Sequence, residues 1–250
     1  MWAQKALLLA AQCQKDQALN WAKKAREKRK ECPLCTNALG RVLQYTGDCE
    51  AALEYFKQAW EWDETDPVLF HDYAMSLHSV GRTEEALSIL RKAVDERPRV
   101  SLFRRGMATL LSDMERHEEA LDTAKKAMAL EPKSLDSQAL MASVLCAMGR
   151  IQEALVLADA LAEKVPLRPG VWALRGKVLQ RMARLEESLL CFEKALELNE
   201  CTDFIWLGHG KVLLELNRTM EARESLEKAF ELGDKRIQKE AGAFLKSRAF

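Results

Sequence analysis

Residues 81–90 read GRTEEALSIL, and this phrase decides the fold because the chain contains seven versions of it. The versions start at a constant spacing of 34 residues, at Cys13, Gly47, Gly81, Glu115, Gly149, Ala183 and Asn217. A small residue recurs at one fixed place in each version: Ala18, Ala52, Ala86, Ala120, Ala154, Ser188 and Ala222. Small side chains at such places let helix backbones approach closely, and a unit of this length buries its apolar face only against its neighbours.

Prolines mark the limits of the helices within each unit. All six fall in one window of the period, three where a helix starts and three just past the end of one: Pro33, Pro67 and Pro169, and Pro98, Pro132 and Pro166. The first turn of a helix tolerates a residue without an N–H. Between these points the apolar residues follow helical spacing, as Leu77, Leu87 and Leu90 do. We therefore predict an all-α chain of helix–turn–helix units with roughly 14 residues per helix.

The length and the pattern of small and large residues resemble the tetratricopeptide repeat (TPR). Two units carry most of the motif: Phe70, Leu77, Gly81, Ala86, Ala93 and Pro98 in one, and Trp172, Gly176, Leu179, Phe192 and Ala195 in the other. The sequence departs from the pattern where Lys5, Arg175 and His209 replace an apolar residue, and where Glu115 and Asn217 replace the turn glycine. The resemblance implies a right-handed superhelical solenoid in which the first helix of each repeat lines the concave wall.

We expect a single solenoid over residues 1–250. The repeats would span about 1–32, 33–66, 67–100, 101–134, 135–168, 169–202 and 203–234. Residues 235–250 would add a capping helix with Ile237, Ala241, Phe244 and Leu245 on one face. At the other end Trp2 already lies inside the first helix, so we expect the chain to be a piece of a longer protein.

Composition narrows the classes of function. Lys and Arg together number 38, as do Asp and Glu, and zero net charge argues against binding to nucleic acid. The basic run 23–30 would be a solvated helix end, with an acidic partner or RNA as the alternative. The apolar stretch Ala6–Ala11 is too short for a signal peptide, and no run suits membrane insertion. Seven cysteines without a disulfide-scaffold pattern favour a reducing compartment, so we predict a cytoplasmic protein.

The sequence offers no constellation of catalytic residues and no cofactor site. It has no glycine-rich phosphate loop between a strand and a helix, and no nucleophile elbow. Cys32 and Cys35 form a C-x-x-C motif, but a structural zinc site needs four ligands. Cys13 and Cys49 would lie a full helix away, at the other edge of the solenoid, so we expect no metal. Packing thiols are the default interpretation, with redox reactivity at the first turn of a helix as the alternative.

The expected concave wall gives the candidate partner-binding residues. They are Asn37, Arg41, Gln44, His71, Met75, His78, Arg105, Thr109, Ser143, Lys177, Arg181 and Lys211. Ala139 and Ser143 are small, which would leave room for a bulky group of a ligand. An acidic ligand would be favoured by four basic residues of this wall: Arg105, Lys177, Arg181 and Lys211.

A row of apolar residues forms a second candidate surface. Leu34, Val68 and Leu102 occupy matching places in three successive repeats, near the start of the first helix. They either pack against the neighbouring repeat or form an exposed apolar ladder for a partner.

We interpret the chain as a non-enzymatic scaffold that binds a peptide segment or a helix of another protein in its concave groove. Two alternatives remain. The chain could be a regulatory or substrate-recruiting TPR domain of a larger enzyme, or a TPR protein that assembles into homo-oligomers.

Overall fold

The computed structural model describes residues 1–12, 14–199, 202–233 and 235–247. These residues form fifteen helices and no strand. In chain order the helices are α1 (Trp2–Ala11), α2 (Lys15–Lys28), α3 (Pro33–Tyr45), α4 (Cys49–Trp62), α5 (Pro67–Ser79), α6 (Thr83–Glu96), α7 (Ser101–Asp113), α8 (His117–Leu130), α9 (Leu135–Ala147), α10 (Ile151–Lys164), α11 (Pro169–Arg181), α12 (Leu185–Leu198), α13 (Asp203–Glu215), α14 (Thr219–Leu232) and α15 (Lys235–Ser247). The prediction of an all-α solenoid is confirmed.

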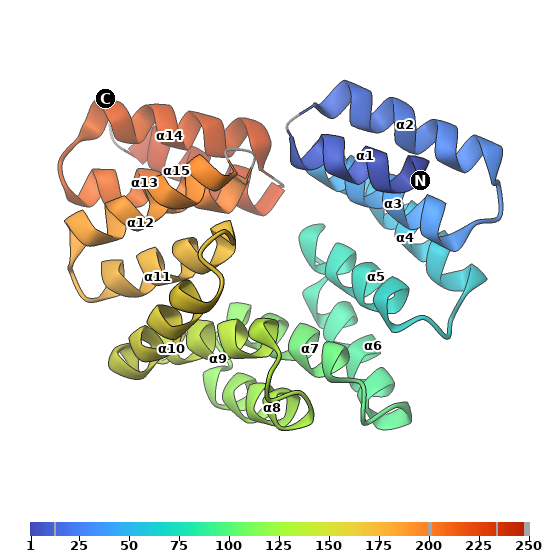
Figure 1. The fold of residues 1–250 in the computed structure, drawn as a ribbon, viewed down its shortest axis with the longest axis horizontal. Coiled ribbons are helices and arrows are strands. Elements are labelled where there is room, and N and C mark those ends of the chain that lie inside the picture. The colour runs from blue at the N-terminus through green and yellow to red at the C-terminus, as the bar shows by residue number, and fades with distance from the viewer. Residues whose placement is uncertain (13, 200–201, 234, 248–250) are drawn as a thin grey trace.

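The helices alternate between two layers of a curved stack. Figure 1 shows α3, α5, α7, α9, α11 and α13 on the inner side of the curve and helices such as α8, α10 and α14 on the outer side. The stack curls so far that its C-terminal helices face α1 and α3. Pro33, Pro67 and Pro169 occupy the first turn of α3, α5 and α11, as the sequence predicts. Asp48 and Asp66 cap the helices that follow them by accepting backbone N–H hydrogen bonds.

Small residues hold the two layers together. Ala52, Ala86 and Ala120 are at most 1% exposed, and Ser188, in the corresponding place, donates a hydrogen bond to the carbonyl of Gly176. The turn between the two helices of a unit has a left-handed residue in each described copy. That residue is Gly47, Gly81, Glu115, Gly149, Ala183 or Asn217. Three copies therefore place a side chain where glycine is favoured.

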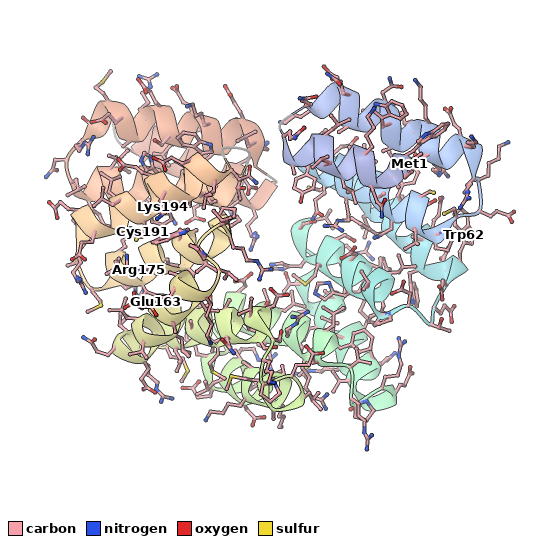
Figure 2. The ribbon with its side chains drawn as sticks, in the orientation of Figure 1. Met1, Trp62, Glu163, Arg175, Cys191 and Lys194 are labelled. Carbon is pink, nitrogen blue, oxygen red and sulfur yellow. The ribbon has the colours of Figure 1, made fainter. Side chains whose placement is uncertain are left out.

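The three departures from the apolar pattern each have a partner. The ammonium group of Lys5 lies 3.9 Å from the centre of the Trp21 ring. Arg175 donates to Asp159 at 2.6 Å and to the thiol of Cys191 at 3.1 Å (Figure 2). The imidazole of His209 lies 2.9 Å from the Ser225 hydroxyl. Because these contacts satisfy the polar groups, the departures leave the helix stack unbroken.

The last helix closes the hydrophobic core, as predicted for a cap. Ile237 and Ala241 are buried, and Phe244 and Leu245 pack against the same apolar cluster. None of the helices that the structure describes combines the length and apolar character needed to cross a bilayer.

Candidate functional site

Two hollows lie on the inner side of the curve. The first has a volume of about 440 Å³ and lies between the N-terminal and C-terminal helices. Arg41, Gln44 and Met75, all candidate wall residues, line it from α3 and α5. Phe204 of α13 and Arg236 of α15 line it from the other end of the chain. The curl of the solenoid therefore joins distant parts of the sequence in one site.

The second hollow has a volume of about 370 Å³ and belongs to the C-terminal half of the wall. It collects Ser143 from α9, Lys177 from α11 and Lys211 from α13, three candidates from the sequence. Its apolar lining comes from neighbouring helices and comprises Ala173, Leu174, Phe192, Phe204 and Leu207. This is an apolar recess with cationic groups beside it.

The cations around this recess differ in their availability. Lys211 forms an ion pair with Glu240 of α15, and its ammonium group lies 5.6 Å from the centre of the Phe244 ring. Lys177 and Arg181 are exposed, and neither makes an ion pair or side-chain hydrogen bond to another described residue. Lys177 and Arg181 are thus the cations that an acidic ligand would meet first.

Near the N-terminal end of the wall, polar side chains bind one another instead. Asn37 is 6% exposed and donates to Asp72 at 2.9 Å. The Nδ1 atom of His71 lies 3.5 Å from a carboxylate oxygen of Asp72. The side-chain oxygen of Asn37 is buried without a partner. The amide nitrogen of Asn37 is therefore occupied by Asp72 within the chain.

A polar cluster links the middle of the wall to the last helix. Asp113 of α7 accepts from Nε2 of His78 at 2.9 Å and from Arg236 at 3.0 Å. A carboxylate only accepts, so Nε2 carries the hydrogen and Nδ1 faces the Thr83 hydroxyl at 3.0 Å. Burial alone would raise the pKa of Asp113, but the hydrogen bond from His78 and the charges of Arg236 and Lys177 hold it below its ordinary value. Asp113 is therefore an anion that anchors α15 to the wall.

Arg105 and Thr109 are also engaged. Arg105 forms an ion pair with Asp136 at 3.1 Å, and Arg168 shares the same carboxylate at 2.7 Å. The Thr109 hydroxyl donates to the backbone carbonyl of Arg105. Arg105 therefore has a partner within the chain, although two arginines and one carboxylate leave this group with one net positive charge.

Several hydrogen-bond partners of the wall residues were not predicted, although the sequence holds a signal for them. Asn37 pairs with Asp72, His78 with Asp113, and Gln180 with Glu215 across successive first helices. Each pair is 35 residues apart. A search for complementary side chains at that spacing would have found them.

Phe204 continues the apolar ladder of Leu34, Val68 and Leu102 at the same place in a later repeat. Leu34 is 65% exposed and Val68 is 47% exposed, so burial against a neighbour is the wrong interpretation for these two. Leu102 is half-buried. Phe204 is 49% exposed and lines both hollows. The ladder position is thus a source of accessible apolar surface.

The cysteines separate into two kinds. Cys49, Cys146 and Cys191 are buried, whereas Cys32 and Cys35 are half-buried at the start of α3. Cys13 lies outside the described residues. Within the part of the chain that the structure describes, no group of three His, Cys, Asp or Glu side chains could hold a metal ion.

Sequence comparison identifies the repeat. The tetratricopeptide repeat family matches residues 45–110, 111–178 and 169–200, which together cover more than half of the chain. The chain belongs to the tetratricopeptide repeat family. TPR proteins generally act as scaffolds for contacts between proteins. No curated protein sequence is close enough to match this TPR chain.

Solved TPR structures share the fold. A tetratricopeptide repeat protein from Parabacteroides merdae is 18% identical, with 98% of each chain covered and a TM-score of 0.67. A thermophilic TPR protein of Thermus thermophilus is 22% identical, with 73% of this chain and 100% of that chain covered and a TM-score of 0.63. The human IFIT1 dimer, solved with m7Gppp-AAAA, is 17% identical over 91% of this chain and 59% of that chain, with a TM-score of 0.64. At these identities the likeness concerns the fold alone.

Proposed function

We propose that this TPR chain is a non-enzymatic scaffold that binds a peptide segment or a helix of a partner protein along its concave wall. The acidic part of the partner would lie near Lys177 and Arg181. Its bulkiest apolar side chain would occupy the second hollow, beside Ser143 and Phe204. We place this function in the cytoplasm, because the cysteine content favours a reducing compartment.

The observation that carries the proposal is the pairing of an apolar recess with unpaired cations. The recess is lined by Leu174, Phe204 and Leu207, and the side chain of Lys177 lies at the same recess. Apolar surface supplies most of the binding free energy in such a site, while charges at its edge set specificity and the rate of encounter. A short segment with an aromatic or aliphatic anchor next to an acidic residue fits both features.

A peptide library displayed on phage tests this function. Selection on the immobilised protein should enrich peptides with Asp or Glu next to a large apolar residue. Changing Lys177 and Arg181 together to Glu should weaken binding of a synthetic enriched peptide by about 10- to 100-fold, because attraction becomes repulsion. Ser143→Trp should abolish binding sterically. Fluorescence anisotropy measures each affinity, and raising the salt concentration should weaken wild-type binding.

The double change Lys125→Glu and Lys126→Glu is the matched control, because it makes the same charge change on the outer helix α8. It should leave the affinity unchanged. Enriched peptides that bind the Lys177/Arg181 variant and Ser143→Trp as tightly as the wild type would place binding elsewhere. Enrichment of motifs without acidic residues would contradict the predicted chemistry.

A further inference from the structure

The C-x-x-C motif lines neither hollow and has no role in the proposed scaffold. Cys32 is the N-cap residue of α3, and Pro33 occupies the first position of the helix. The Cys32 sulfur accepts a hydrogen bond from the backbone N–H of Cys35 at 3.3 Å. The two thiols therefore lie side by side where the loop after α2 enters α3.

The two thiols differ in their pKa values. Burial alone would raise the pKa of Cys32, but hydrogen bonds from the thiol and the backbone N–H of Cys35, with the charge of Arg29, hold it below its ordinary value. Burial, the hydrogen bond to Cys32 and the negative charge on Cys32 raise the pKa of Cys35 to about 11. Cys32 is the better thiolate, and Cys35 keeps its proton.

The other described cysteines do not share this arrangement. Cys146 is 1% exposed and Cys191 is 2% exposed, and burial raises the pKa of each thiol. Cys49 is likewise 1% exposed. Their thiols are closed off from solvent, and that of Cys191 accepts a hydrogen bond from Arg175. Only the pair combines partial exposure with two adjacent sulfurs, among the cysteines that the structure describes.

A disulfide between the pair requires the first turn of α3 to tighten. Residues three apart on a helix have Cβ atoms about 5–6 Å apart, and a disulfide holds its two Cβ atoms about 3.5–4.5 Å apart. Small local adjustments of the side chains and the cap would bring the sulfurs together. The rest of α3, from Thr36 to Tyr45, would keep its backbone hydrogen bonds.

We propose that Cys32 and Cys35 form a thiol–disulfide exchange site that donates two electrons to a disulfide substrate and is itself oxidised to a disulfide. The Cys32 thiolate attacks one sulfur of the substrate, forming a mixed disulfide and releasing the first substrate thiolate, which takes up a proton. Cys35 then loses its proton and attacks the Cys32 sulfur, releasing the second substrate thiolate. The chain gains an intramolecular disulfide, and the substrate disulfide is reduced to two thiols.

The surroundings favour an anionic substrate. In the end of α2 and the following loop the cations Arg26, Lys28, Arg29 and Lys30 outnumber the anions Glu27 and Glu31, and Arg29 already lowers the pKa of Cys32. A negatively charged disulfide is attracted to this cluster, whereas a neutral one is not. Oxidised glutathione is the anionic probe, and 2-hydroxyethyl disulfide is the neutral one.

The experiment follows the mass and the modified positions of the whole chain, with peptide mapping to separate residues 32 and 35 from the other five cysteines. Incubation with oxidised glutathione should remove the mass of two hydrogen atoms and link residues 32 and 35. In Cys35→Ser the reaction should stop with one glutathionyl group on Cys32. Oxidised glutathione should react at least about tenfold faster than the neutral probe at low salt, and high salt should remove the difference.

Cys32→Ser is the matched control, because serine is a good N-cap and removes only the attacking thiol. This variant should keep the wild-type circular-dichroism spectrum and should leave Cys35 unmodified by oxidised glutathione. Wild-type protein that keeps both thiols free, or a Cys35→Ser variant that accumulates no adduct on residue 32, would overturn the exchange site. Equal rates with the two probes would overturn the preference for an anionic substrate.

Discussion

The N-terminal and C-terminal arms of the solenoid differ at one inner-helix position that recurs every 34 residues. In the N-terminal arm this position holds Lys5 and then four apolar residues, Leu39, Tyr73, Met107 and Met141, whereas in the C-terminal arm it holds Arg175 and His209. Leu39, Tyr73 and Met141 are buried in one apolar cluster. That cluster reaches only to Val178, and a second cluster begins at Ala173. The core is therefore divided where the apolar series ends, beside Arg175.

The contrast shows that one helical framework can be stabilised in two ways. The N-terminal arm uses buried apolar area, which tolerates exchange between residues of similar size. The C-terminal arm uses directed contacts, since Arg175 depends on Asp159 and His209 faces Ser225. Both partners lie sixteen residues from the group they bind, on the adjacent outer helices α10 and α14. A directed contact is lost when its partner is missing. Substitutions at this position should therefore change the free energy of unfolding differently in the two arms.

Exchanging the residues between the arms should give the largest effect. Met141→Arg places a cation in a buried site, and Lys125 occupies the place that Asp159 has relative to Arg175. We expect a loss of about 3–5 kcal/mol in the free energy of unfolding, because the charge is buried beside a like charge. Changing Arg175 to Met and Asp159 to Leu together should be neutral or stabilising by about 1 kcal/mol, because apolar groups replace both members of a half-buried ion pair. Urea unfolding followed by circular dichroism measures both changes.

Met141→Leu serves as the control and should lower the stability by less than about 1.5 kcal/mol. If Met141→Arg were tolerated as well as Met141→Leu, the difference between the arms would not be a matter of partnered charge.

Acid should weaken the C-terminal arm through His209. Burial, with the nearby cations of Arg218 and Lys228, lowers the pKa of His209 from 6.5 to about 4. Between these values the unfolded chain binds the proton and the folded chain does not, so stability falls as the pH falls from about 6.5 to about 4. His209→Leu should remove about 1–3 kcal/mol of this pH dependence, because the residue is half-buried.

The measurement is urea unfolding at a series of pH values across this window, for the wild type and His209→Leu. His71→Leu is a useful comparison in the N-terminal arm, because His71 lies beside the carboxylate of Asp72. A pH dependence that is identical in the wild type and His209→Leu would show that His209 is not the titrating group.

The turns differ among the repeats on a smaller scale. Gly47, Gly81 and Gly149 have left-handed backbone, whereas Glu115, with φ of 60°, and both turns of the C-terminal arm, at Ala183 and Asn217 with φ of 59° each, place a side chain in the same conformation. Ala183→Gly should raise the free energy of unfolding by about 1 kcal/mol, because it relieves the left-handed strain on a side chain. Gly81→Ala should lower it by a similar amount. Thermal unfolding detects both shifts, and equal midpoints for all three proteins would contradict this account.

Much of this architecture follows from the sequence, because the constant spacing of 34 residues shows which positions of the successive helices correspond. The helix starts at Pro33, Pro67 and Pro169 and the buried cap residues Ile237 and Ala241 are local signals read at fixed spacing. The second hollow was also partly predictable, since Ser143, Lys177 and Lys211 occupy matching inner positions. Their role in binding stays a prediction.

The contacts of the wall were harder to predict, because they depend on side-chain partners in the next repeat. Asn37 and His78 look like free polar groups until Asp72 and Asp113 are placed beside them. Arg236 is a different case. Its contact with Asp113 depends on the small rotation between each repeat and the next, summed along the stack, and no local pattern encodes that sum.

The contact between Arg236 and Asp113 depends on the curvature of the whole solenoid. Arg236 and Asp113 are 123 residues apart, and the helices between them form a continuous arc in Figure 1. A change of a few degrees at each intervening junction adds up along the arc, so the ion pair opens long before any single interface is disturbed. Spectroscopic labels on the two helices α7 and α15 would report the distance between them. A flatter or tighter solenoid would then appear as a change in this one distance.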